Sequence, residues 1–141
     1  MGGMYGTYEH TLDAKGRIFI PSRLRDELGD EFFVTVSFEK CLTAYSCASW
    51  EKILEKVAEK SKVEQKKIRF LFARAANCKL DDQGRILLPL LLREYAGLKK
   101  NVTVVGMGDC AEFWDKDTWD EVDAQETTQE NIKNVFMELG I

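Results

Sequence analysis

The chain has 141 residues, of which 45% are hydrophobic and 31% are charged, so it is long enough to bury a core and is not a disordered tail. No run approaches the roughly 18 apolar residues of a membrane helix, and the N-terminus lacks the basic-then-apolar layout of a signal peptide, so we expect a soluble, cytoplasmic protein. The net charge is −4, but the ten acidic residues and two lysines from Asp109 onward leave +4 on residues 1–108, so a nucleic-acid partner is not excluded.

The first predicted feature is a β-hairpin in residues 7–20. Residues 7–12 and 17–20 have the pattern of short strands, and the D-x-x-G sequence between them is typical of a tight turn. Asp13 can accept backbone hydrogen bonds in such a turn, and Gly16 can adopt the positive φ that other residues resist. We therefore interpret both residues as structural.

A short helix is predicted next, at residues 21–28. Pro21 suits the first turn of a helix, Leu24 and Leu28 share one face, and Gly29 follows as a C-terminal cap. Two further strands are predicted at residues 32–38 and 42–45.

Two amphipathic helices are predicted in the middle of the chain, with a break near Ser61. Apolar residues recur at helical spacing in both: Trp50, Ile53, Leu54 and Val57 in the first, and Ile68, Leu71, Phe72 and Ala75 in the second. The apolar stripe of this connector must be buried on its own repeats or on a neighbouring subunit.

The chain then repeats itself. Residues 12–36, placed over residues 80–104 without a gap, give twelve identities in 25 positions, and Asp81, Gly84 and Arg85 take the places of Asp13, Gly16 and Arg17. The second copy therefore predicts the same hairpin and turn, a helix at residues 89–96 ended by Gly97, and strands at residues 102–106 and 111–115. A tail helix follows, with an apolar face near Ile132, Val135, Phe136 and Leu139.

These elements divide the chain into four predicted parts. They are a first repeat (residues 5–49), a helical connector (50–76), a second repeat (77–122) and an acidic C-terminal helix (123–141).

Catalysis is poorly supported by the sequence. His10 is the only histidine, and we interpret it as structural or solvent-facing. Asp13 and Asp81 could be mistaken for a catalytic pair, but a structural role in the two turns is the better interpretation. The four cysteines form no C-x-x-C pair and, with one histidine, no zinc-ligand set. We expect reduced thiols, no metal, no cofactor and no small-molecule substrate.

Nucleic-acid binding fits the residues better. Four cations lie within eleven residues of the first copy: Lys15, Arg17, Arg23 and Arg25. Arginine can hold a phosphate or pair with guanine through two hydrogen bonds, although a small charged cluster is as often only a solvated surface. The second copy keeps Arg85 and Arg93 but has Gln83 and Leu91 at the other two positions. The first copy is therefore the better candidate for reading DNA.

The segment LDAKGRIFIPSRLRDELG resembles the AbrB-type swapped-hairpin DNA-binding motif. Together with the second copy, the connector and the segment AEFWDKDTWDEV, it makes nearly the whole chain similar to the MraZ family of bacterial transcriptional regulators. The resemblance implies an α+β fold in which two tandem half-domains form a double-split β-barrel, with a two-helix connector and a C-terminal helix.

The resemblance also implies a function. Members of that family form ring-like oligomers, commonly octamers, and bind repeated promoter boxes of the division and cell-wall gene cluster, in the cytoplasm at the nucleoid. By position, the DNA-binding arginines would be Arg17 and Arg85 after the turns, with Arg25 on the helix. Two alternatives stay open: a ring-forming scaffold whose arginines bind an acidic protein, and an antitoxin-like interaction module.

Overall fold

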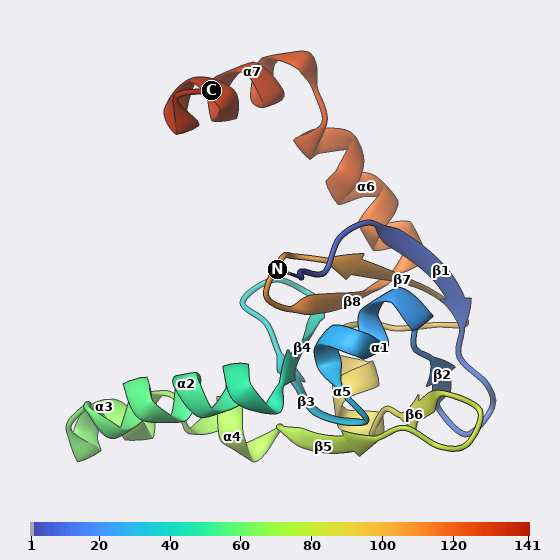
Figure 1. The fold of residues 1–141 in the computed structure, drawn as a ribbon, viewed down its shortest axis with the longest axis vertical. Coiled ribbons are helices and arrows are strands. Elements are labelled where there is room, and N and C mark those ends of the chain that lie inside the picture. The colour runs from blue at the N-terminus through green and yellow to red at the C-terminus, as the bar shows by residue number, and fades with distance from the viewer. Residues whose placement is uncertain (1) are drawn as a thin grey trace.

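The computed structural model describes residues 2–141, which form an α+β protein with two tandem repeats (Figure 1). The strands are β1 (Thr7–Thr11), β2 (Arg17–Phe19), β3 (Glu31–Val36), β4 (Leu42–Ser46), β5 (Ala76–Lys79), β6 (Arg85–Leu87), β7 (Asn101–Gly106) and β8 (Ala111–Asp115). The helices are α1 (Ser22–Leu28), α2 (Cys47–Ala58), α3 (Lys62–Lys67), α4 (Arg69–Ala73), α5 (Leu90–Tyr95), α6 (Lys116–Glu126) and α7 (Gln129–Leu139).

The two repeats exchange strands. Among the described residues there is a six-stranded antiparallel sheet, in the order β1-β7-β8-β4-β3-β5, and a separate ribbon of β2 and β6. Each repeat places its first strand in the other repeat, because β1 pairs with β7 and β5 pairs with β3. Strands β4 and β8 join the two halves at the centre of the sheet. The repeats are therefore one interlocked unit.

The predicted hairpins are wrong in their pairing. Strands β1 and β2 follow one another across a tight turn, but β2 pairs with β6 and β1 with β7. In the ribbon, Ile18 lies opposite Ile86, and both side chains are buried. A local hairpin could not bury its apolar face alone, whereas the exchanged pairing buries both isoleucines against each other's repeat.

The hydrogen-bonded strands do not close into the barrel that the resemblance implies. Strands β1 and β5 are the two ends of the six-stranded sheet, so the sheet is open. The core lies between this sheet, the ribbon and the two short helices: Ile18 and Ile86 of the ribbon share one apolar cluster with Leu24 of α1, Leu92 of α5 and Phe113 of β8.

The two short helices of the repeats are confirmed. Helix α1 runs from Ser22 to Leu28, and Gly29 follows it with φ of 84°. Helix α5 ends at Tyr95 and has Ala96 as its C-terminal cap, so its glycine, Gly97 with φ of 62°, lies one residue further from the helix than Gly29 does from α1.

The connector contains three helices where two are predicted. The predicted break is confirmed at Ser61, whose hydroxyl caps α3 by accepting a hydrogen bond from the N–H of Glu64 at 3.2 Å. The chain breaks again at Ile68, between α3 and α4. Trp50 of α2 anchors the connector to the sheet, because its ring stacks on Phe33 at 5.1 Å and meets Phe72 of α4 edge-on at 5.8 Å.

The C-terminal segment contains two helices where one is predicted. Helix α6 begins directly after β8, and Trp119 on it packs on the buried Trp114 with ring centroids 5.8 Å apart, so both tryptophans belong to an apolar cluster. The chain turns at Thr127 and Thr128, and the Thr128 hydroxyl caps α7. Figure 1 shows α6 and α7 extending away from the body of the protein. No helix within residues 2–141 is long and apolar enough to cross a membrane.

Candidate nucleic-acid interface

The two turns before β2 and β6 have the same hydrogen bonds. In the first, the Asp13 carboxylate accepts from the backbone N–H groups of Lys15 and Arg17, both at 2.9 Å, and the N–H of Gly16 donates to the Asp13 carbonyl at 3.0 Å. Gly16 has φ of 87°. The Arg17 backbone bond is the largest influence that lowers the pKa of Asp13, to about 2, and the carboxyl therefore stays ionised at any physiological pH.

The second turn copies the first. Asp81 accepts from the N–H groups of Gln83 and Arg85 at 2.9 Å, its pKa is lowered chiefly by the Arg85 backbone bond, and Gly84 has φ of 78°. Each turn is thus held in one conformation by an aspartate whose carboxylate accepts two backbone hydrogen bonds.

The ribbon presents one face to solvent, which we call the ribbon face: Arg17, Phe19, Arg85 and Leu87. Successive side chains of a strand point to opposite sides, so these four are on the face opposite the buried Ile18 and Ile86. Sequence reasoning missed Phe19 and Leu87, although the alternation of arginine, isoleucine and a large apolar residue in both strands could have indicated them.

The two arginines of the ribbon face differ in their surroundings. Arg17 Nε binds Asp13 Oδ2 at 2.7 Å, and Arg85 Nε binds Asp81 Oδ2 at 2.9 Å. Arg85 also reaches Asp13 Oδ2 at 3.8 Å and lies over the Phe19 ring at 5.8 Å. Its side chain is 19% exposed, against 35% for Arg17. Arg17 is therefore the more accessible of the pair.

The helix arginines Arg25 and Arg93 lie within the fold. Each donates from Nε to a carbonyl of its own repeat, Ile20 at 2.8 Å for Arg25 and Leu88 at 2.9 Å for Arg93. Each guanidinium also lies against the turn glycine of the other repeat. Both side chains are half-buried, so the structure places them as links between the repeats.

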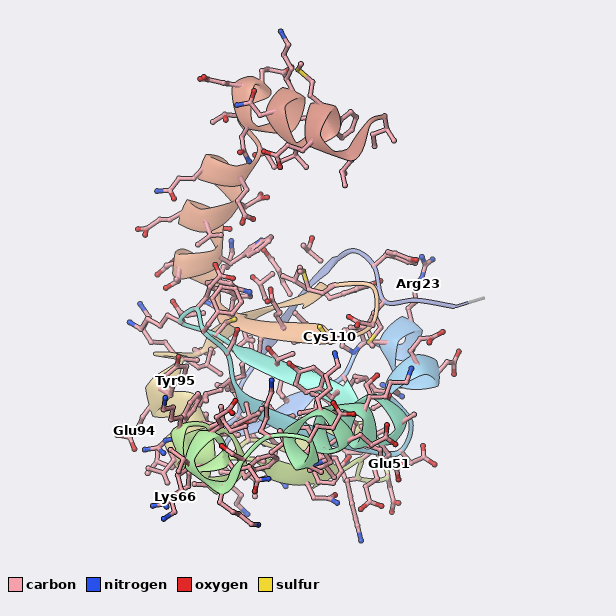
Figure 2. All side chains as sticks on the ribbon, turned by 90° about the vertical axis from the view of Figure 1, so that its left-hand side faces the viewer. Arg23, Glu51, Lys66, Glu94, Tyr95 and Cys110 are labelled. Atoms are coloured by element: carbon pink, nitrogen blue, oxygen red, sulfur yellow. The ribbon has the colours of Figure 1, made fainter. Side chains whose placement is uncertain are left out.

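The remaining cations of the first copy are exposed. Lys15 is on the turn next to Arg17, and Arg23 is on the outer side of α1, where it lines a small pocket with Tyr5 and Tyr8. Figure 2 shows Arg23 well separated from Lys66 of the connector. The structure thus brings Arg17 and Arg85 together around Asp13, with Lys15 on the same turn, and places Arg23 on α1 beside Tyr5 and Tyr8.

The other chemical groups do not join this surface. His10 is half-buried on β1, where desolvation and the nearby Arg25 lower its pKa. Within residues 2–141 no group of three histidine, cysteine or carboxylate side chains could hold a metal ion. The thiols are unpaired, and burial raises the pKa of Cys41 to about 12 and that of Cys78 to about 11, which keeps both protonated.

A two-stranded ribbon with arginines on its outer face can enter the major groove of DNA, which is about 12 Å wide. The charges around the ribbon are mixed: three cations, Lys15, Arg17 and Arg85, stand beside the carboxylates of Asp13, Asp81 and Asp82. The Asp13 and Asp81 carboxylates orient the arginines, and a planar guanidinium held in this way keeps free N–H groups for a base edge or a phosphate.

Comparison with known proteins gives a consistent result over the whole chain. The family described as "MraZ protein, putative antitoxin-like" matches residues 4–72 and, again, residues 71–137. Proteins named transcriptional regulator MraZ are similar to this chain over most or all of their length. That of Acetivibrio thermocellus is 42% identical over 97% of this chain and 99% of its own, and that of Caldicellulosiruptor bescii is 39% identical over 98% and 99%. The relative from Carboxydothermus hydrogenoformans is 46% identical over 81% of this chain and 82% of its own.

Proposed function

Since the chain belongs to the MraZ family, whose relatives here are named transcriptional regulators and not enzymes, we propose that it is a sequence-specific DNA-binding regulator of transcription. The ribbon face is the DNA-reading surface in this proposal. The observation that carries it is that Arg17 and Arg85 both lie on the outward face of a narrow two-stranded ribbon, where each is held by a turn aspartate.

The residues have graded roles in this proposal. Arg17 contacts a base edge, with Lys15 on the adjacent phosphates, while Arg85 contributes less because Asp13 and Phe19 already engage it. Arg23 adds a contact to the DNA backbone from α1. Arg25 and Arg93 act indirectly, by fixing the two turns that carry the ribbon, and Asp13, Gly16, Asp81 and Gly84 build those turns.

The resemblance supplies the finer part of the proposal. The protein binds repeated boxes in the promoter of the division and cell-wall gene cluster, as a ring-like oligomer of the nucleoid. A ring holds several ribbons at once, and linked weak sites bind repeated boxes far more tightly than one site does. Such avidity would offset the net charge of −4, which disfavours DNA binding by a single protomer.

A second candidate function is an antitoxin-like protein-interaction module. The specific observation in its favour is apolar: Phe19 and Leu87 on the ribbon face, with Leu90 and Leu91 at the start of α5, are all exposed. Exposed apolar residues that cluster beside a few charges are typical of a protein-binding surface.

A gel-shift measurement with the DNA upstream of the protein's own gene, at two salt concentrations, tests the proposal. We expect specific complexes whose affinity falls steeply with salt, with a footprint that repeats from box to box. Protection without repeats, or binding equal to that of unrelated DNA, would contradict sequence-specific regulation. Binding to no DNA at all, with a salt-insensitive protein partner instead, would favour the interaction module.

A further inference from the structure

The last helix of the chain carries an apolar face that is largely exposed within residues 2–141, with only Ile132 half-buried. Ile132, Val135, Phe136 and Leu139 are spaced by three and four residues, so they lie along one side of α7. Phe136 is 51% exposed and Leu139 is 65% exposed. Both views of the molecule show α7 at the far end of the protruding α6–α7 arm (Figures 1 and 2).

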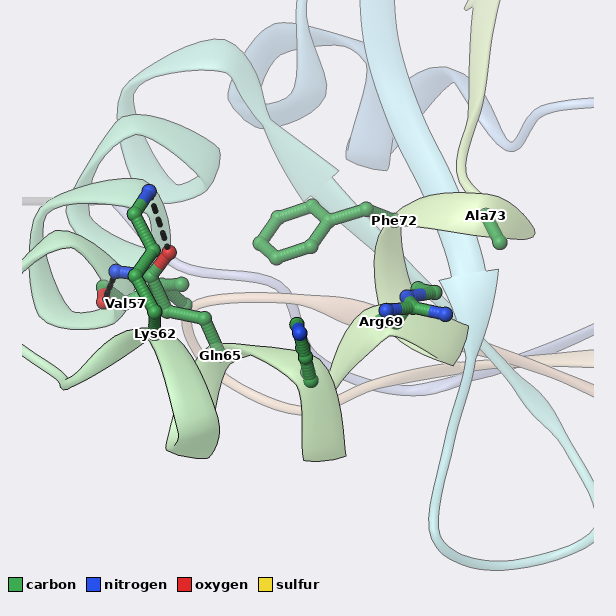
Figure 3. Close-up of a pocket in the computed structure, with 7 residues that line it drawn as sticks. Val57, Lys62, Gln65, Arg69, Phe72 and Ala73 are labelled. Atoms are coloured by element: carbon green, nitrogen blue, oxygen red, sulfur yellow. Dashed lines mark hydrogen bonds between the residues drawn. The ribbon is translucent and has the colours of Figure 1, made fainter.

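The connector contains a groove that could accept this helix, since its lining is partly apolar and partly positively charged. A cavity of about 450 Å³ opens between α2, α3 and α4; its apolar lining consists of Val57, Phe72 and Ala73, and its cations are Lys62, Lys66 and Arg69 (Figure 3). The groove is preformed, because the Gln65 side chain ties α3 to α2 by donating to the carbonyls of Val57 at 3.2 Å and Lys60 at 2.9 Å. Phe72 is fixed against Trp50.

The two surfaces have opposite charge. Residues 116–139, which contain α6 and α7, carry seven acidic residues and two lysines. Residues 47–74, which contain α2, α3 and α4, carry eight basic and four acidic residues. Opposite potentials steer two surfaces toward each other and select against pairing of like surfaces, so the acidic α6–α7 arm is disfavoured as a partner for another such arm.

The groove and the helix of one chain lie at opposite ends of the molecule. The α6–α7 arm is at the top and the connector at the bottom in both Figure 1 and Figure 2, which differ by a turn about the vertical axis. The occupant of the groove is therefore the helix of a second copy. Each copy then offers one helix and one groove, and such a head-to-tail contact closes into a ring when the rotation between neighbours allows it.

We propose that α7 of each protomer docks by its apolar face in the connector groove of the next protomer. The inference deepens the proposed function, since it supplies the contact on which the proposed ring rests, and it assigns the acidic C-terminal segment a role in assembly. Phe136 and Leu139 enter the apolar part of the groove, and the acidic residues of the arm face Lys62, Lys66 and Arg69.

Two variants of the full chain test the contact by light scattering in the absence of DNA. A tail variant combines Phe136→Glu with Leu139→Glu, and a groove variant combines Lys66→Glu with Arg69→Glu. Each alone should fall from the wild-type assembly to the 16.2 kDa single chain. An equimolar mixture should form a complex of twice that mass and no larger one, because the tail variant still has a groove and the groove variant still has a tail.

Matched controls add the same charges elsewhere. Asn134→Glu is on the side of α7 away from its apolar face, and Lys52→Glu with Lys56→Glu is on α2 outside the groove lining. Both controls should assemble like the wild type. Circular dichroism of all variants should match the wild type, since every substituted side chain is exposed.

Several outcomes would overturn the proposal. A groove variant that assembles normally would show that α7 packs elsewhere, and a mixture that stays monomeric would exclude head-to-tail docking. A monomeric wild type would exclude both the docking and the ring. The DNA-binding function is judged separately by the gel shift, so a failed shift with successful complementation would remove the function and leave the contact standing.

Discussion

Arg25 lies so close to Gly84, in the other repeat, that a Cβ atom on the glycine would be 2.5 Å from the guanidinium carbon. The relationship is repeated in the opposite direction, since a Cβ on Gly16 would be 2.7 Å from Arg93 Cζ. In each case the carbonyl of the same glycine accepts a backbone hydrogen bond from the partner repeat: Gly84 from Ile20 at 3.0 Å and Gly16 from Leu88 at 2.9 Å. Each turn is therefore clamped by the other half of the chain.

The first prediction concerns the two turn glycines. Gly84→Ala and Gly16→Ala should each destabilise the fold, because a side chain at positive φ costs about 1–3 kcal/mol and the new methyl group must also displace an arginine. Gly108→Ala is a matched control: Gly108 has φ of 83°, but a Cβ there would meet nothing within 4 Å. Chemical denaturation should show a larger loss for the turn variants than for Gly108→Ala. Equal losses would mean that only the backbone matters.

The second prediction separates fold from DNA contact at the helix arginines. Arg25→Ala should lower the free energy of unfolding by about 1.5–3 kcal/mol, because the carbonyl of Ile20 loses a charged hydrogen-bond donor. Arg23→Ala, on the exposed side of the same helix, should change stability by less than about 0.5 kcal/mol. Thermal melting measures both. If Arg25→Ala melts like the wild type but loses DNA, Arg25 is a direct contact and its assignment as a link between repeats is wrong.

The third prediction compares the arginines of the ribbon face. Arg17→Ala should weaken operator binding more than Arg85→Ala, because Arg17 is more exposed and stands beside Lys15, whereas Arg85 is shared between Asp81, Asp13 and Phe19. Loss of one arginine–base contact made through two hydrogen bonds costs about 1–3 kcal/mol of binding free energy for a single ribbon. Titrated gel shifts, with assembly checked by light scattering, give the order. The reverse order would make the second repeat the reader.

The fourth prediction concerns acid stability. Asp13 has a pKa lowered from 3.8 to about 2, so its charged form stabilises the folded state at neutral pH, and that contribution is lost as the pH falls from about 4 towards about 2. Asp13→Asn should therefore be less stable than the wild type at pH 7 and should show a flatter loss of stability on acidification. Circular dichroism across this range checks it. Asp26→Asn, which removes an exposed carboxylate of α1 outside the turns, is the control for the loss of one negative charge.

Much of the local structure could be predicted from the sequence because its signals are local. The sequence D-x-x-G locates both turns, and proline followed by leucines and glycine locates α1, because each signal reflects the conformational limits of a few neighbouring residues. The break before α3 was visible for the same reason, since Ser61 is a strong N-terminal cap.

What could not be predicted depends on the other repeat. Strand β2 carries the same apolar alternation whether it pairs with β1 or with β6, and nothing near Ile18 in the sequence distinguishes the two. The sequence alone predicts Arg25 as an exposed cation on its helix. In the structure the exchanged strands place Gly84 of the other repeat against its guanidinium. No glycine or proline marks the break at Ile68, so the sequence predicts one helix where the structure has α3 and α4.

Strand exchange within one chain has a consequence for symmetry. Two identical chains related by a twofold axis would present identical halves of the ribbon and would match a palindromic site. Here a single polypeptide carries both halves, and they have diverged: Lys15 and Arg23 on one side correspond to Gln83 and Leu91 on the other. The ribbon therefore has a direction, and a DNA sequence that fits it is free to be asymmetric.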